Sequence, residues 1–248
     1  MSRLKAVILA AGKGTRMKSD LPKVLHEIDG KPLVEYVIEA ARAAGAEDIC
    51  LVVGHQAELV KERIGDGVTY VLQEEQLGTG HAVKCAADFI GTDGDTMILC
   101  GDTPIITGKT LDALLAYHRL YELKVTVLST ILPDATGYGR IVRDADGNFL
   151  RIVEQKDATE EEKQIHEINS GMYIFQSAAL ADSLKKITNQ NAQKEYYLTD
   201  TIQIIHDENG TNGIAAGAMA TEQADETRGV NTPEQLAEAA EIIRSREQ

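Results

Sequence analysis

Cysteine is scarce in this 248-residue sequence, and it contains no long hydrophobic run. The three cysteines, Cys50, Cys85 and Cys100, have neither the spacing of metal ligands nor the even count of a disulfide framework. We expect them to be reduced core residues without a catalytic role. No apolar run approaches the ~18 residues of a membrane-spanning helix. The composition therefore predicts a cytoplasmic protein that does not act on a membrane.

Positive charge is also scarce, since 25 Lys and Arg residues face 39 Asp and Glu residues, for a formal net charge of -14. A protein this acidic repels nucleic acid, which argues against a general polyanion binder. Residues 1–31 are the exception, because they hold seven basic and three acidic side chains. This segment is about +4 and the remainder about -18, so a small anion is expected to bind near the N-terminus.

Apolar β-branched runs alternate with helical patterns along the first half of the chain, as in βαβ units around a parallel sheet. The predicted strands are Leu4–Ala10, Ile49–Val53, Val68–Leu72, Met97–Cys100 and Val125–Ile131. The predicted helices are Leu33–Ala44, Ala57–Ile64, Gly80–Phe89 and Leu111–Leu120. The pattern predicts an α/β fold with a Rossmann-like, mainly parallel mixed sheet flanked by helices.

The parallel pattern is interrupted after residue 133. Arg140–Arg143 and Phe149–Glu154 flank Asp146-Gly147, a turn pair typical of an antiparallel hairpin. Further strands are predicted at Gly171–Phe175 and Gly213–Ala218. This part of the chain should form a small antiparallel β-lobe beside the main sheet.

The last segment begins with a strong helix-start signal. Thr232 can cap, Pro233 can occupy the first helical position, and Gln235 can complete a capping box. Since no Pro-, Ser- or Gly-rich linker divides the chain, we expect one domain over residues 1–248. Its parts are a main α/β part at 1–132, a lobe-containing part at 133–231 and a C-terminal helix at 232–248.

The segment richest in candidate chemistry follows the first predicted strand. It reads Leu9-Ala10-Ala11-Gly12-Lys13-Gly14-Thr15-Arg16-Met17 and continues with Leu21-Pro22-Lys23. Glycines allow backbone N–H groups to approach phosphate oxygens, and Lys13, Arg16 and Lys23 add positive charge. The segment is neither a dinucleotide fingerprint nor a Walker A loop. Taken alone, it favours a flexible strand-to-helix loop with solvated lysines.

Asp102 is the best candidate for a metal ligand. It follows the run Met97–Cys100 and so lies at the carboxyl end of a predicted parallel strand, where open α/β sheets bind ligands. The alternative is a turn-forming Asp before Thr103-Pro104, which we favour less. Magnesium takes few protein oxygens and keeps water and phosphate as its other ligands, so one carboxylate plus one amide oxygen is sufficient.

The phosphate-loop segment resembles the signature of sugar-nucleotide pyrophosphorylases. Other segments resemble, in order, the N-terminal uridyltransferase domain of the bifunctional bacterial GlmU family: Leu72–Ala82, Gly101-Asp102, Gly137–Ile141, Val153-Glu154, Glu167–Gly171, Glu195–Asp200 and Gly229–Asn231. The resemblance covers nearly the whole chain and implies a nucleotide-diphospho-sugar transferase fold.

The sequence departs from this family in two places. Cys100 stands where the family often has Tyr, which puts any contact of such a ring in doubt. No hexapeptide repeat of a left-handed β-helix acetyltransferase domain is present, so acetyl transfer is not predicted. Because family members assemble as trimers largely through that β-helix, we expect a monomer.

The resemblance implies Mg²⁺-dependent transfer of UMP from UTP to N-acetylglucosamine 1-phosphate, with pyrophosphate released. The product, UDP-N-acetylglucosamine, would serve cell wall and peptidoglycan synthesis. A pyrophosphorylase using glucose 1-phosphate or dTTP remains an alternative. So does a non-catalytic sensor that binds UDP-sugars, although the intact Arg16, Lys23 and Asp102 argue against it. A nicotinamide dehydrogenase is disfavoured because the glycine fingerprint fails.

The resemblance also assigns roles to individual residues. It implies catalytic roles for Arg16, Lys23 and Asp102, and magnesium ligation by Asp102 and Asn231. Substrate binding is implied for Leu9, Ala10, Ala11, Gly12, Lys13, Gly14, Lys23, Gln73, Gln76, Gly78, Thr79, Gly101, Gly139, Glu154, Asn169, Tyr197, Thr199 and Asn231.

Within that set, the loop residues Gln73 to Thr79 would recognise uracil, and the group from Gly139 to Thr199 would hold the sugar. Local alternatives remain open for both groups. The first could be an ordinary polar loop. In the second, Gly139 could be a hairpin-turn residue and Glu154 an exposed strand end. Asn231, outside both groups, could merely assist helix capping. We expect His81, near the loop that would bind the nucleotide, to have a helix-surface or packing role rather than a catalytic one.

Overall fold

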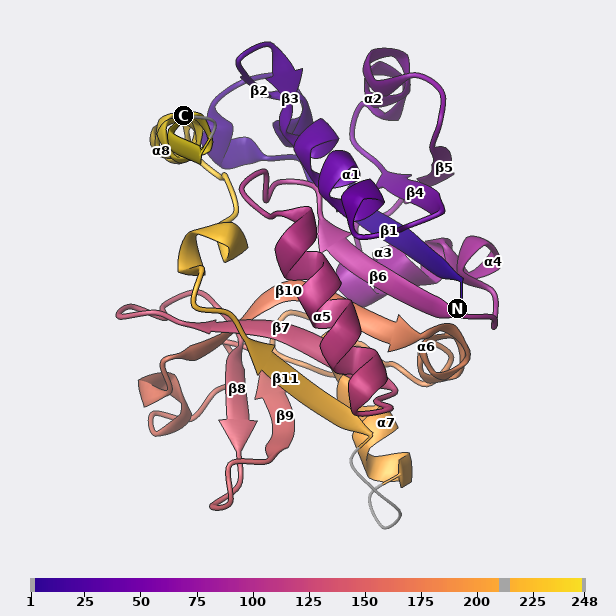
Figure 1. The fold of residues 1–248 in the computed structure, drawn as a ribbon, viewed down its shortest axis with the longest axis vertical. Coiled ribbons are helices and arrows are strands. Elements are labelled where there is room, and N and C mark those ends of the chain that lie inside the picture. Colours follow the sequence, from indigo (N-terminus) through magenta and orange to yellow (C-terminus); the bar gives the residue numbers. More distant parts are fainter. Residues whose placement is uncertain (1–2, 210–214, 247–248) are drawn as a thin grey trace.

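The computed structural model describes residues 3–209 and 215–246. Among these residues, nine strands form one mixed sheet, and helices cover both faces (Figure 1). Seven of the strands follow the order β11-β7-β10-β6-β1-β4-β5, and β8 and β9 lie off this path. Strand β1 (Leu4–Ala10) pairs in parallel with β4 (Asp48–Val53) and β6 (Asp95–Cys100), and β4 pairs in parallel with β5 (Thr69–Leu72). The predicted parallel half of the sheet is therefore confirmed.

The other half of the sheet is built around one long antiparallel strand. Strand β10 (Glu167–Gln176) runs antiparallel to both β6 and β7 (Val125–Ile131). Strand β11 (Ala216–Ala220) then pairs in parallel with β7 at the edge. The hairpin of β8 (Arg140–Arg143) and β9 (Phe149–Val153) attaches to β10 and forms the predicted antiparallel lobe.

Alternation along β1 places its side chains in two different cores. Leu4, Ala6 and Ile8 face a core that also contains residues of α1 (Leu33–Ala43), α2 (Ala57–Ile64) and α5 (Gly108–Leu120). Val7 faces the opposite core. Because strand side chains point alternately to the two faces, a strand buried on both sides reads as a continuous apolar run.

The opposite core is covered by four helices. These are α3 (Thr79–Cys85), α4 (Ala87–Ile90), α6 (Ser177–Ser183) and α7 (Thr199–Asn209). The prediction of one helix over 80–89 was wrong, because Ala86 has helix-breaking dihedrals (φ -89°, ψ 12°) and its N–H bonds to Val83 O. This tightened turn divides the segment in two.

The C-terminal helix α8 (Pro233–Arg246) lies beside the segment that contains β2 (Glu27–Ile28) and β3 (Lys31–Pro32) (Figure 1). Ala239, Ala240 and Ile243 form a third core with Met17 and with Ile28 of β2, which pairs with β3. Helix α8 therefore packs against the loop that follows β1 through Met17.

The start of α8 agrees with its sequence signal except in one hydrogen bond. Thr232 Oγ1 accepts the Gln235 N–H at 3.3 Å, as a capping residue should. The Gln235 side chain reaches one residue further back than a capping box requires and accepts the Asn231 N–H at 2.8 Å. The helix start is therefore tied directly to Asn231.

Two further predictions fall partly outside the described residues. The strand predicted at Gly213–Ala218 begins outside the described residues, and β11 is described from Ala216 to Ala220. The last helix is described to Arg246, and residues 247–248 lie outside the described part. None of the described helices is both long and apolar enough to cross a membrane.

Candidate active site

The carboxyl ends of β1 and β6 open into a cavity of about 320 Å³. Most of the residues around it are ones that the sequence singled out, although they come from four separate parts of the chain. Its walls are formed by Leu9, Ala10, Ala11, Gly12, Lys23, Val24, Gln73, Gln76, Gly78, Thr79, Ala82, Cys100, Asp102 and Glu195. This is the edge of an open α/β sheet at which ligands bind.

The loop after β1 is shaped by two glycines with different surroundings. A Cβ atom at Gly14, whose φ is 62°, would lie 2.5 Å from Cβ of Lys23, so only glycine lets the two arms of the loop pack together. A Cβ atom at Gly12 would meet nothing within 4 Å. Lys13 and Arg16 are exposed on this loop. The loop therefore presents an open backbone edge and two cationic side chains to solvent.

Four predicted residues meet in one polar cluster beside the cavity. Lys23 Nζ donates to Asp102 Oδ2 in a short contact and to Asn231 Oδ1 at 2.9 Å. Arg16 Nη2 donates to the same Asn231 oxygen at 2.8 Å. A backbone hydrogen bond keeps Asp102 close to Asn231, since the N–H of the preceding residue, Val230, donates to Asp102 O at 2.8 Å. Residues far apart in the sequence thus form one charged site.

The donor set of this cluster fits a hard divalent cation. Asp102 and Asn231 each direct a side-chain oxygen at a single ammonium group, so a cation already bridges them. Within the described ranges no three His, Cys, Asp or Glu residues gather into a site of their own. One carboxylate and one amide oxygen suit magnesium, which keeps water and substrate phosphates as its remaining ligands.

The loop between β5 and α3 forms the next wall. Gln73 is only 3% exposed, and its Nε2 donates to Gly78 O at 3.2 Å and contacts His81 Nδ1 at 3.1 Å. A Cβ atom at Gly78 would come within 2.6 Å of Tyr196 O, so glycine permits this close approach. The predicted packing role of His81 includes holding the Gln73 amide, which the sequence did not indicate.

Two other predicted residues complete this side. The Gly101 N–H donates to Leu9 O at 3.0 Å, and a Cβ atom at Gly101 would lie 3.0 Å from that oxygen. Gly101 therefore lets the end of β6 stay close to β1. Thr79 Oγ1 accepts the Leu198 N–H at 3.2 Å and so joins the loop between β5 and α3 to the segment before α7.

The residues implied to bind the sugar lie on and around β10. Thr199 Oγ1 donates to Glu154 Oε1 at 3.0 Å, and the Asn169 N–H donates to Gly139 O at 2.9 Å. A Cβ atom at Gly139 would lie 3.5 Å from both Glu154 Oε2 and Asn169 Cβ. Gly139, Glu154, Asn169 and Thr199 therefore form one group, which we call the sugar-side group.

Tyr197 is placed differently from the rest of the implied sugar residues. It is 7% exposed, and its hydroxyl donates to Asp157 Oδ2 at 3.3 Å. The Asn169 Nδ2 donates to the hydroxyl of Tyr173 at 2.7 Å, a contact that no sequence signal indicated. Cys100, on the cavity wall, reaches Gly171 O through its thiol at 3.5 Å. Strand β10 thus links the sugar-side group to the cavity.

Burial dominates the electrostatics of the sugar side. It raises the pKa of Glu154, and the negative charges of Asp157 and Asp200 act in the same direction, against the hydrogen bond from Thr199. Burial also raises the pKa of Asp200. Burial raises the pKa of the Cys100 thiol to about 12, so this thiol stays protonated at neutral pH and is a poor nucleophile.

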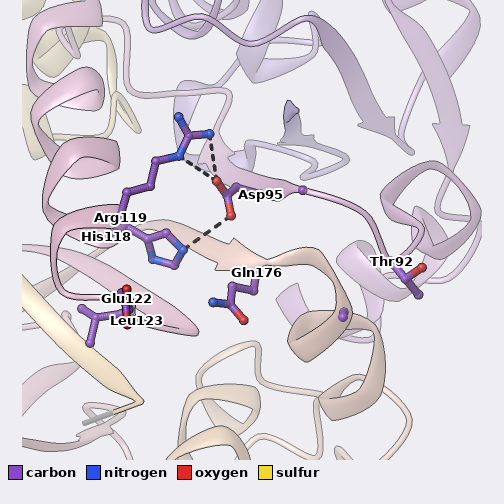
Figure 2. Close-up of a pocket in the computed structure, with 9 residues that line it drawn as sticks. Thr92, Asp95, His118, Arg119, Glu122, Leu123 and Gln176 are labelled. Carbon is purple, nitrogen blue, oxygen red and sulfur yellow. Dashed lines mark hydrogen bonds and ion pairs between the residues drawn. The ribbon is translucent and has the colours of Figure 1, made fainter. Parts of the chain in front are cut away.

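A larger cavity, of about 600 Å³, lies at the other end of the same central strands (Figure 2). Asp95 begins β6 there, and its carboxylate pairs with Arg119 at 2.9 Å and faces His118 Nε2 at 3.8 Å. Gln176 ends β10 in the same wall. This cavity opens at the amino end of β6, whereas ligands of α/β sheets bind at the carboxyl ends. The smaller cavity is therefore the candidate active site.

Comparisons with known proteins agree with the motif resemblance. The bifunctional protein GlmU of Caldanaerobacter subterraneus subsp. tengcongensis is 51% identical over 246 residues, and that of Thermoanaerobacter pseudethanolicus is 52% identical over 246 residues. GlmU of Clostridioides difficile is 48% identical over 242 residues. These alignments cover 98–99% of this chain. The chain spans about half the length of these relatives, 52–53%.

A solved structure supports the fold. The crystal structure of UDP-glucose pyrophosphorylase complexed with UDP-glucose superposes with a TM-score of 0.78, covering 99% of this chain and 100% of that chain at 19% identity. The predicted nucleotide-diphospho-sugar transferase fold is therefore confirmed. Residues 5–218 match the family model described as nucleotidyl transferase. The chain belongs to the nucleotidyl transferase family.

Proposed function

We propose that the chain transfers UMP from UTP to N-acetylglucosamine 1-phosphate, releasing pyrophosphate and giving UDP-N-acetylglucosamine. The observation that carries this proposal is the Lys23–Asp102–Asn231 cluster, which lies beside the cavity that Gln73 lines. Strand β10 joins this cavity to the sugar-side group. Relatives named GlmU, similar over nearly the whole chain, support the choice of substrates.

The Gln73 amide is suited to recognise uracil. Its Nε2 is engaged by Gly78 O and His81, while in the described part of the chain its Oε1 accepts no hydrogen bond. An acceptor at this point matches the N3–H of uracil, whereas cytosine presents an acceptor there. Two opposed acceptors in a buried site cost the desolvation of both groups, so the pocket should reject cytosine.

Phosphate binding falls to the basic loop in this proposal. Lys13 and Arg16 would hold the triphosphate tail, and Lys23 would bring the sugar phosphate to the α-phosphorus. A divalent cation held by Asp102 and Asn231 would supply neutralisation of phosphate charge, and magnesium suits these two oxygens. Residues 1–132 would thus bind the nucleotide, and residues 133–231 would hold the sugar through Glu154 and Asn169.

The reaction needs alignment more than acid–base chemistry. The sugar phosphate oxygen is already ionised at neutral pH, so it can attack the α-phosphorus in line without a general base. The bond from the α-phosphorus to the bridging oxygen breaks as the new bond forms, and pyrophosphate leaves with the electron pair. The cationic side chains Arg16 and Lys23 would then lower the barrier by holding the reactants in line and by offsetting negative charge.

A substrate panel tests the proposal. Pyrophosphate release is measured with UTP or dTTP against N-acetylglucosamine 1-phosphate and glucose 1-phosphate, with Mg²⁺ present. The highest kcat/KM is expected for UTP with N-acetylglucosamine 1-phosphate. A folded sample that releases no pyrophosphate with any pair rejects the proposal. Binding of UDP-N-acetylglucosamine by calorimetry without turnover would instead favour a sugar-nucleotide sensor.

A further inference from the structure

Lys23 occupies a position with two possible uses. Its ammonium contacts Asp102 Oδ2 and Asn231 Oδ1, the two oxygens that would hold a divalent cation under the proposed function. The Lys23 and Asp102 side chains are only 16% and 19% exposed, so the contact is largely shielded from water. The same ammonium is also the group assigned to the sugar phosphate.

The two uses exclude one another in space. A magnesium ion binds its oxygens at about 2.0–2.1 Å, and an ammonium within hydrogen-bond distance of the same two oxygens fills that position. Two cations at such short range also repel each other strongly, because the shielded site screens them poorly. The ammonium must therefore leave the Asp102–Asn231 pair before a divalent cation can bind both oxygens.

We propose that Lys23 is the resident cation of the Asp102–Asn231 pair in the ligand-free protein and that a divalent cation displaces it. The displaced ammonium then becomes available to the sugar phosphate. Lys23 can therefore bind the sugar phosphate only after a divalent cation has bound to Asp102 and Asn231. This inference rests on the proposed function, since it concerns the same site.

The surroundings of Lys23 suit such a movement. Its stem is anchored, because Cβ of Lys23 packs against the backbone at Gly14. The main chain of Asp102 is held by the Val230 N–H, which donates to Asp102 O, and its carboxylate packs against Gly229, where a Cβ atom would lie 3.3 Å from Oδ2. Only the end of the Lys23 chain has to swing away, and the oxygens stay aligned.

Direct binding of Mn²⁺ to the free protein, without nucleotide or sugar phosphate, tests the proposal. Calorimetry or water-proton relaxation compares wild type with Lys23→Met, which keeps the length of the side chain and removes its charge. We expect Lys23→Met to bind Mn²⁺ about tenfold more tightly or better, because the competing charge is gone. Lys23→Gln serves as a second uncharged variant if Lys23→Met does not fold.

Control variants separate displacement from a general charge effect. Lys18→Met removes the same charge from an exposed residue of the same basic segment and should keep wild-type affinity. Lys23→Arg retains the charge and should also keep the weak wild-type affinity, whereas Asp102→Asn should lose Mn²⁺ binding. Equal or weaker binding by Lys23→Met, or no Mn²⁺ binding by either protein, overturns the proposal. Since no turnover is required, failure of the transfer assay is a separate result.

Discussion

The carboxylates on the two sides of the candidate active site have opposite electrostatic surroundings. On the nucleotide side, Asp102 is paired with the ammonium of Lys23 and lies close to Arg16 through Asn231. On the sugar side, Glu154 accepts a hydrogen bond from the Thr199 hydroxyl, and within the described residues it forms no ion pair. Burial raises its pKa, and the negative charges of Asp157 and Asp200 act in the same direction.

This difference suits the two substrates of the proposed function. Phosphates need cations, whereas uncharged sugar hydroxyls and amides are well served by acceptors such as a carboxylate or an amide oxygen. The carboxylates Glu154, Asp157 and Asp200 would also repel a triphosphate, which favours its placement on the basic loop. Under the proposed function, the cleft would orient a sugar 1-phosphate with its anionic end toward Lys23 and its hydroxyls toward Glu154 and Asn169.

The largest effect should come from removing the carboxylate of the nucleotide side. Asp102→Asn keeps the shape of the side chain but loses the charge that would hold a divalent cation. We expect pyrophosphate release to fall on the order of 100-fold or more, since charge neutralisation in the transition state is usually the largest catalytic term. The fold is checked by circular dichroism, and a folded variant with turnover near that of wild type would contradict the assignment.

A tenfold effect confined to one substrate is expected on the sugar side. Glu154→Gln should raise KM for the sugar 1-phosphate about tenfold, because hydrogen bonds to charged acceptors contribute about 1.5–3 kcal/mol. The KM for UTP should stay close to wild type. Initial rates with each substrate varied in turn measure both constants. If both KM values rose together, the division of the cleft into two sides would be wrong.

A smaller effect is expected at Gln235, which holds the backbone of Asn231 from the first turn of α8. Gln235→Ala removes this acceptor and should lower the free energy of unfolding by about 1 kcal/mol, a value typical of lost capping interactions. Gln235→Glu retains an acceptor and is the matched control. Urea unfolding measures both variants, and equal destabilisation by the two would show that the hydrogen bond to Asn231 is unimportant.

The smallest effect concerns the pH dependence of stability. Burial raises the folded-state pKa of Glu154 above its ordinary value of 4.5, so the folded protein binds this proton more tightly than the unfolded chain. Glu154 therefore adds stability as pH falls through the raised pKa, and this contribution is absent at neutral pH. Glu154→Gln should be more stable than wild type at neutral pH, with the difference shrinking toward pH 4.5.

Urea unfolding of both proteins between neutral pH and pH 4.5 measures this difference. Asp200, whose pKa is also raised by burial, remains in the variant, so part of the pH dependence should persist. A difference that stays constant with pH, or that grows as pH falls, would contradict the desolvated state of Glu154.

The parallel half of the fold could be predicted from local pattern alone. Strand β1 has the bounds that its apolar run indicated, and the glycine-rich loop follows it directly. Asp102 could be placed at the sheet edge because the carboxyl ends of parallel strands share that edge. These inferences work because strand length, alternation and glycine turns depend on neighbouring residues.

The sugar side could be anticipated only through family resemblance. The register of β8 with β10 brings Gly139 to Asn169, and Thr199 of α7 bonds Glu154, which directly follows β9. No local pattern specifies these contacts. Residues that support the site were still harder to predict, because His81 and Gln235 act by holding other side chains or backbone groups. These supporting contacts depend on tertiary packing, which leaves little signal in a single sequence.

A crystal structure of this chain with UDP-N-acetylglucosamine and Mg²⁺ tests the central claim most directly. We predict the uracil ring against Gln73, the phosphates beside Gly12 and Lys23, and the sugar against Glu154 and Asn169. Lys23 should have left the Asp102 carboxylate, with the metal ion in its place. A nucleotide bound elsewhere, such as in the cavity beside Asp95 and His118, would contradict the account.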